Sequence, residues 1–131
     1  MATLSKGNRK SKPLRLLLVD DEQEILDIIQ NLLENHIHTQ SLRIHTALSG
    51  NDAIEMLRND FQFDLIVSDY TMGNGNGLTV LNYVLEKKIK SKFVFFTSSS
   101  GFKTPSPNEN YLGIIDKTDL NSLVEYVHEC I

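Results

Sequence analysis

The fold is decided by the stretch LIVSD at residues 65–69, which continues directly as YTMGNGNG at residues 70–77. A short apolar run bounded by turn residues predicts a buried strand. This strand ends on the carboxylate of Asp69 and passes into a glycine-rich loop. In a parallel sheet, side chains at the carboxyl end of a strand face the crevice in which ligands bind. Asp69 is therefore the first candidate for a functional residue.

Strand-like and helix-like segments alternate along the rest of the chain. Apolar runs and alternating patterns predict strands at residues 14–19, 42–47, 65–69, 93–97 and 112–115. Apolar residues at helical spacing predict helices at residues 22–36, 78–88 and 120–131, the last capped by Thr118 or Asp119. A further predicted helix begins at the cap Ser49 and has Ala53, Ile54 and Leu57 on its apolar side. This order predicts an α/β fold, a doubly wound parallel sheet with helices on both faces.

One connection departs from that alternation. Residues 98–111 read SSSGFKTPSPNENY and should hold a crossover helix between the last two strands. They contain Gly101, Pro105 and Pro107, and proline inside a helix costs ~3 kcal/mol or more. The sequence therefore predicts a loop, or one short turn, in place of this helix.

Length and composition restrict the class of protein. A chain of 131 residues, 40% hydrophobic and 23% charged, is most simply one globular domain. It contains neither an apolar run of the ~20 residues that a membrane span needs nor the apolar core of a signal peptide. The single cysteine, Cys130, excludes an internal disulfide and fits a reducing compartment. We expect a cytoplasmic protein with no membrane partner.

The charge is unevenly distributed. Residues 1–13 carry four basic residues and no acid, whereas the remaining nine basic and 17 acidic residues give −8. Such a polar terminus predicts a disordered, solubilising basic arm. Contact with nucleic acid or anionic lipid is the alternative that its charge leaves open.

Polar residues stand at the ends of four of the predicted strands: Asp20 and Asp21 after the first, Asp69 and Thr97 as the last residues of the third and fourth, and Lys117 after the fifth. In a doubly wound sheet these strand ends lie at one rim. Clustered carboxylates need a cation, and Mg²⁺ prefers oxygen ligands. A lysine and a hydroxyl at the same point suit a phosphoryl group. The set predicts an aspartyl phosphate site with magnesium, although paired acids alone are also typical of a helix N-terminus.

Four segments then identify a family. LLLVDDE at residues 16–22, LIVSDYTMGNGNG at 65–77, FFTSS at 95–99 and IIDKTDL at 114–120 resemble the signature segments of response-regulator receiver domains. The resemblance covers residues 14–131 and implies the CheY-like fold, a five-stranded parallel sheet in the order 2-1-3-4-5. It also implies roles for six residues: Asp69 as phospho-acceptor, Asp21 as a direct Mg²⁺ ligand, Asp20 completing the acidic pocket, the Thr71 backbone carbonyl as a further ligand, Thr97 as the switch hydroxyl, and Lys117 as the contact to the phosphoryl group.

The resemblance implies a function in two-component signalling. Asp69 would take a phosphoryl group from a histidine kinase or a histidine phosphotransfer protein and lose it slowly by self-hydrolysis, so the protein would be a phospho-acceptor and not an enzyme. Because the chain ends where the fold ends, we expect a stand-alone receiver with no DNA-binding domain. It would then act on an unknown downstream protein, or pass the phosphoryl group onward.

Three positions depart from the family pattern. Gly73 replaces a proline after the acceptor, Thr118 replaces the proline that follows Lys117, and Ile114 replaces the aromatic switch residue. A cis bond before Thr118 would cost ~2.5–4 kcal/mol. These changes leave open a second hypothesis, a pseudo-receiver that acts as an interaction module without phosphorylation.

Two other classes of function are disfavoured. A haloacid-dehalogenase-like phosphohydrolase would need a second aspartate two residues after Asp69, where the chain has Thr71, which lacks an acid/base group. Nucleotide binding by residues 73–77 is disfavoured because GxGxG is not the GxGxxG fingerprint. A flexible loop is the better interpretation of these glycines.

Overall fold

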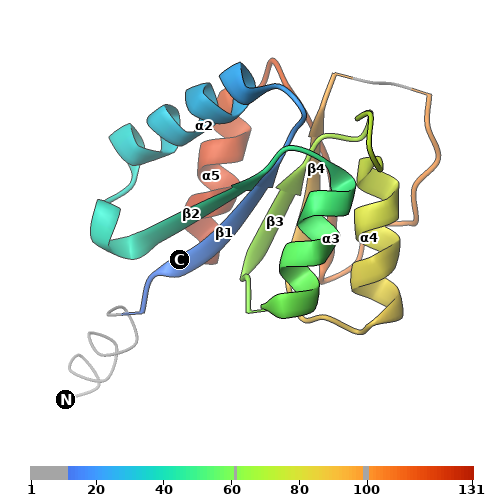
Figure 1. The fold of residues 1–131 in the computed structure, drawn as a ribbon. Coiled ribbons are helices and arrows are strands. Elements are labelled where there is room, and N and C mark those ends of the chain that lie inside the picture. The colour runs from blue at the N-terminus through green and yellow to red at the C-terminus, as the bar shows by residue number, and fades with distance from the viewer. Residues whose placement is uncertain (1–11, 61, 99–100) are drawn as a thin grey trace.

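A five-stranded parallel sheet in the order β2-β1-β3-β4-β5 forms the centre of the computed structural model, which describes residues 12–60, 62–98 and 101–131 (Figure 1). The strands are β1 Leu14–Val19, β2 Leu42–Ala47, β3 Leu65–Ser68, β4 Lys92–Thr97 and β5 Tyr111–Asp116. This order confirms the doubly wound α/β fold. Most of the expected basic arm, residues 1–11, lies outside the described residues.

Helices cover both faces of the sheet. They are α2 Gln23–His36, α3 Gly50–Asn59, α4 Gly77–Glu86 and α5 Leu120–Cys130, with a short 3₁₀ turn η1 Thr39–Ser41 that the sequence did not predict. Figure 1 shows α2 and α5 on one face and α3 and α4 on the other. Within the described part of the chain, no helix is long and apolar enough to cross a membrane.

Three of the helices, α3, α4 and α5, begin at side-chain caps. The Ser49 hydroxyl accepts a hydrogen bond from the Asp52 amide at 3.0 Å, as the sequence predicts for the start of α3. Of the two candidate caps for α5, Asp119 is the one used, and its carboxylate accepts from the Ser122 amide at 3.2 Å. These bonds satisfy amides that have no partner within their own helix.

The core lies on both sides of the central strands. Leu16 and Leu18 of β1 face the cluster formed with α2 and α5, whereas Leu17 and Val19 face the cluster formed with α3 and α4. A strand that is buried on both faces needs apolar side chains in both directions. This requirement explains why β1 is an almost unbroken apolar run.

The connection from β4 to β5 has no helix among its described residues, as its prolines predict. Asn108 closes a turn at its end, where its side-chain oxygen accepts from the amides of Asn110 and Tyr111, both at 2.8 Å. Gly113 has a φ of +105°, and the β4–β5 register shifts nearby, between Phe93 and Val94. The strand begins at Tyr111, one residue earlier than predicted.

Candidate functional site

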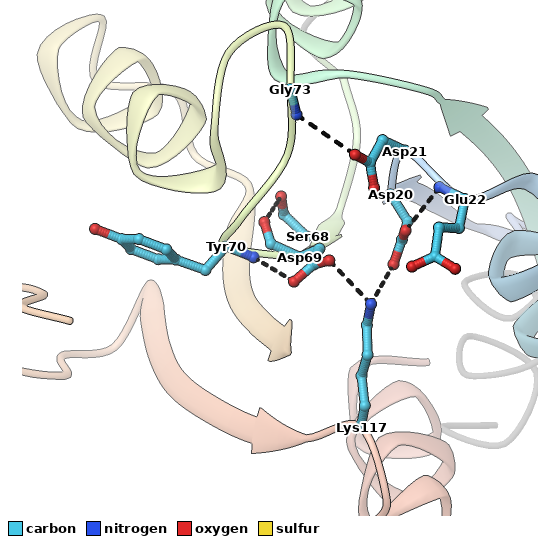
Figure 2. A network of polar contacts seen from close by, with 8 residues as sticks. All are labelled: Asp20, Asp21, Glu22, Ser68, Asp69, Tyr70, Gly73 and Lys117. Carbon is cyan, nitrogen blue, oxygen red and sulfur yellow. Dashed lines mark hydrogen bonds and ion pairs between the residues drawn. The ribbon is translucent and has the colours of Figure 1, made fainter. Parts of the chain in front are cut away.

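The polar residues at the strand ends meet at one rim of the sheet, as Figure 2 shows. Asp20 follows β1, Asp69 follows β3 and Lys117 follows β5. The Asp69 amide donates to the Val19 carbonyl at 2.9 Å, which continues the β1–β3 pairing up to Asp69. The parallel topology therefore places side chains far apart in the sequence within contact distance.

Three carboxylates form the acidic cluster. Asp20, Asp21 and Asp69 each offer an oxygen, and these oxygens lie within 4.8 Å of one another. Asp20 and Asp69 are buried, whereas Asp21 is exposed. Asp20 accepts from the Glu22 amide at 2.9 Å, and Asp21 from the Gly73 amide at 3.4 Å. An all-oxygen donor set of this kind fits a hard divalent cation such as Mg²⁺.

Lys117 is the cation within this cluster. Its Nζ lies 2.8 Å from Asp20 Oδ2 and 2.9 Å from Asp69 Oδ2 (Figure 2). The described residues contain no cis peptide bond, so Lys117 reaches both carboxylates through a trans bond to Thr118. Thr118 is held by Asp116, whose carboxylate accepts from its amide at 2.8 Å and its hydroxyl at 2.7 Å. Thr118, which stands where the family pattern has a proline, is thus part of a hydrogen-bonded turn.

In this cluster, burial and ion pairing shift the pKa values of Asp20 and Lys117 in opposite directions. Burial raises the pKa of Asp20 above its ordinary value, although the Lys117 contact and the Glu22 amide act against the rise. Burial would lower the pKa of Lys117, but hydrogen bonds to Asp20 and Asp69 outweigh it and raise the pKa above its ordinary value. Lys117 is therefore protonated at neutral pH. Asp20 and Asp69 contact this ammonium and Asp21 lies beside them, so the carboxylates of the cluster outnumber its ammonium group and leave capacity for a further positive charge.

The main chain around Asp69 is held on both sides. The Tyr70 amide donates to Asp69 Oδ1 at 2.7 Å, and the Ser68 hydroxyl donates to the Asp69 carbonyl at 2.8 Å. The Gly77 amide donates to the Tyr70 carbonyl at 2.8 Å. A Cβ on Gly77 would collide with the Asp69 carbonyl and lie 2.8 Å from Phe95 Cε1. Sequence reasoning missed both Tyr70 and Gly77, because neither the strand pattern nor the helix pattern marks them.

Thr97 and Thr71 are the two remaining residues that the sequence predicts for the site. Thr97 is buried at the carboxyl end of β4, and its carbonyl accepts from the Lys117 amide at 3.2 Å. Thr71 lies exposed at the start of the loop that follows Asp69. The roles of the Thr97 hydroxyl and the Thr71 carbonyl stay predictions.

The glycine-rich loop is tied to the start of α3. The Gly50 amide donates to the Gly75 carbonyl at 2.9 Å, and the Asn51 amide donates to the Asn74 carbonyl at 3.1 Å. The Asn51 and Asn74 side chains add a bond of 2.7 Å. The glycine content of this loop indicated flexibility but gave no sign of these bonds.

Comparison with known proteins agrees with the geometry. The family model for the response regulator receiver domain matches residues 16–127. Response regulator SaeR of Staphylococcus aureus, in strains USA300 and NCTC 8325, is 34% identical over 85 residues, which are 65% of this chain and 35% of SaeR. The chain therefore spans about a third of the length of these curated relatives.

Solved receiver structures share the fold. The crystal structure of the response regulator TrrA from Thermotoga maritima in complex with Mg²⁺–BeF is 24% identical, with a TM-score of 0.74 over 89% of this chain and 98% of TrrA. The Francisella response regulator 1452 receiver domain is 19% identical, with a TM-score of 0.71 over 91% of this chain and 96% of that domain. Together with the match of the family model over most of the chain, the fold and the acidic cluster lead to one conclusion: this chain belongs to the response regulator receiver domain family.

Proposed function

We propose that this receiver accepts a phosphoryl group on Asp69 from the phosphohistidine of a histidine kinase or a histidine phosphotransfer protein. The observation that carries the proposal is the position of the Asp69 carboxylate, buried at a strand end beside two further carboxylates and 2.9 Å from Lys117 Nζ. Such a site combines a nucleophilic oxygen with fixed positive charge for the phosphoryl oxygens.

The transfer balances as a displacement at phosphorus. An Asp69 oxygen forms the new O–P bond while the N–P bond of the phosphohistidine breaks. The donor imidazole keeps the electron pair of that bond and takes up a proton. Lys117 stabilises the negative charge of the phosphoryl oxygens, and the Thr97 hydroxyl is proposed to donate a hydrogen bond to one of them. Hydrolysis of the acyl phosphate later returns Asp69 to its carboxylate form.

A magnesium ion is proposed as the cofactor. Asp20, Asp21 and Asp69 would hold it through carboxylate oxygens, with the Thr71 carbonyl as a further ligand. When bound, the ion neutralises charge on the phosphoryl oxygens and so lowers the barrier to transfer. The oxygen-only donor set and the surplus of carboxylates over ammonium groups support this assignment.

The output is proposed to be a change in protein–protein interaction or an onward phosphoryl transfer. A phosphoryl group adds negative charge at the rim, where it alters the bonds that Lys117 and the Tyr70 amide make with Asp69. The described residues between β4 and β5 contain no helix, and in this the receiver departs from the alternating pattern of strands and helices.

Incubation with acetyl phosphate, with and without Mg²⁺, followed by intact-protein mass spectrometry tests the proposal. We expect a single Mg²⁺-dependent phosphoryl adduct in the wild type, its loss in Asp69→Asn, and its retention in Asp27→Asn, which changes an exposed carboxylate on α2. An adduct that persists in Asp69→Asn would refute the assignment of the acceptor.

A pseudo-receiver is the second candidate, and one observation favours it. Ile114, which stands at the family's aromatic switch position, is 51% exposed on β5 and so does not form a buried switch. Titration with Mg²⁺ and beryllofluoride, a phosphoryl mimic, separates the two candidates. A phospho-acceptor gains thermal stability with the mimic, whereas a pseudo-receiver shows no response.

A further inference from the structure

Tyr70, the residue after Asp69, stacks on Phe102 in the segment between β4 and β5. The Tyr70 ring lies on the Phe102 ring with centroids 3.8 Å apart and an interplanar angle of 21°. Both rings also contact Phe95 of β4, with centroids 5.3 Å and 6.0 Å away. Phe95 is fully buried, whereas Tyr70 and Phe102 are partly exposed. The loop thus meets the residue next to Asp69 through an aromatic contact.

Tyr70 joins this stack to the reactive carboxylate. Its amide donates to Asp69 Oδ1 at 2.7 Å, and its carbonyl accepts from the Gly77 amide at 2.8 Å. Figure 2 shows its side chain pointing away from the acidic cluster, so the ring and the amide serve different neighbours. Because the amide and the ring belong to one residue, a displacement of the Tyr70 main chain would shift its ring against Phe102.

Phosphorylation changes the hydrogen bond at the Asp69 end of this connection. A charge-assisted bond from an amide to a carboxylate is about twice as strong as a bond between neutral groups. When a phosphoryl group is attached to Asp69 as an acyl phosphate, Oδ1 becomes either a neutral carbonyl oxygen or the bridging oxygen of the mixed anhydride. In both cases the Tyr70 amide loses its carboxylate acceptor. The weaker hydrogen bond then holds Tyr70 less firmly, so its position can shift.

The loop end of the connection is attached separately. Asn108 and Tyr111 exchange main-chain and side-chain bonds of 2.8 Å, and Pro107 Cγ lies 3.6 Å from the position that a Cβ on Gly113 would occupy. These contacts hold the end of the loop near β5. Among the described residues at its beginning, Phe102 supplies the contact that fixes the loop to the site.

We infer that Tyr70 and Phe102 are positioning residues that couple Asp69 to the loop of residues 101–110. The stack orients the Tyr70 amide toward Asp69, and the state of Asp69 in turn changes the position of Phe102. Coupling of this kind is reciprocal. The inference rests on the proposed phosphorylation of Asp69, and it provides a path to the surface that does not involve the exposed Ile114.

The absence of tryptophan from the sequence allows a direct optical test. Phe102→Trp places a single tryptophan on the Tyr70 ring, and Tyr83→Trp places one on α4 as a matched control. Each variant is titrated with beryllofluoride in Mg²⁺, and circular dichroism verifies its fold. We expect a saturable fluorescence change in Phe102→Trp, none in Tyr83→Trp, and loss of the change when Tyr70→Ala is added to Phe102→Trp.

Affinity gives a second readout, which a merely structural role would leave unchanged. Phe102→Ala should weaken the apparent affinity for beryllofluoride, measured by thermal shift, by roughly two- to tenfold, the range that corresponds to an aromatic pair. Phe102→Tyr, which preserves the stack, should restore the wild-type affinity.

The outcomes distinguish the inference from the proposed function. If the mimic stabilises the wild type but Phe102→Trp fluorescence does not respond and Phe102→Ala binds with unchanged affinity, the coupling is refuted while the phospho-acceptor stands. If the mimic fails to stabilise the wild type, both are refuted.

Discussion

Replacement of Lys117 by methionine removes the ammonium from a cluster of three carboxylates. The side chains of Asp20 and Asp69, its two partners, are 3% and 9% exposed. Removal of one partner from a buried ion pair costs about 3–5 kcal/mol, because it leaves an uncompensated charge. The lower end applies here because Lys117 is 16% exposed and Asp21 opens the cluster to water. We expect Lys117→Met to lower the free energy of unfolding by about 3 kcal/mol.

Urea denaturation followed by circular dichroism, first in EDTA and then in increasing Mg²⁺, measures this effect. A loss of about 3 kcal/mol corresponds to a fall in Tm of roughly 10 °C for a domain of this size. A cation that binds only the folded state restores stability according to its free concentration and Kd. Because Mg²⁺ no longer meets the repulsion of Lys117 in the variant, it should stabilise Lys117→Met more than the wild type.

Lys90→Met is the matched control, because Lys90 is exposed and lies away from the carboxylates. Its stability should stay within about 0.5 kcal/mol of the wild type and should gain from Mg²⁺ as the wild type does. Wild-type stability of Lys117→Met in EDTA would contradict the assignment of Lys117 as the cation of the cluster. An equal Mg²⁺ increment in both proteins would contradict the proposed competition between Lys117 and the ion.

Three further predictions follow from particular contacts. Gly77→Ala should lower the free energy of unfolding by about 1–3 kcal/mol in denaturant titrations, because its Cβ collides with the Asp69 carbonyl, whereas Gly73→Ala, with nothing within 4 Å of its Cβ, should not. Tyr111→Phe should leave the Tm unchanged or raise it, because the buried hydroxyl of Tyr111 has no hydrogen-bond partner among the described residues. The pKa of Lys117 is raised above 10.5 in the folded state, so its contribution to stability is complete below pH 10.5 and is lost as the pH rises through the folded value. Urea midpoints measured across the alkaline range should therefore fall less steeply in Lys117→Met than in the wild type.

The sequence by itself determined the elements and the rim at which the site lies. The apolar run of residues 14–19 is long enough to cross the core and ends where its polar residues begin, and residues 65–69 repeat the pattern. Strands that alternate with helices must lie parallel, and parallel strands have their carboxyl ends at one edge. The positions of Asp20 and Asp69 follow from this rule without knowledge of any side-chain contact. The prolines at 105 and 107 likewise predicted that the described residues between β4 and β5 form no helix, because a proline lacks the amide hydrogen that a helix requires.

Only the tertiary structure decided the contacts between segments that are distant in the chain. The stack of Tyr70 on Phe102 depends on the path of a loop without a repeating pattern, so no periodicity indicates it. Lys117 reaches two carboxylates next to a turn in which Asp116 holds Thr118, the residue that stands where the family pattern has a proline. Local patterns record which face of an element is buried, whereas these contacts depend on the register between strands and on the close approach of loops, which form only when the whole sheet assembles.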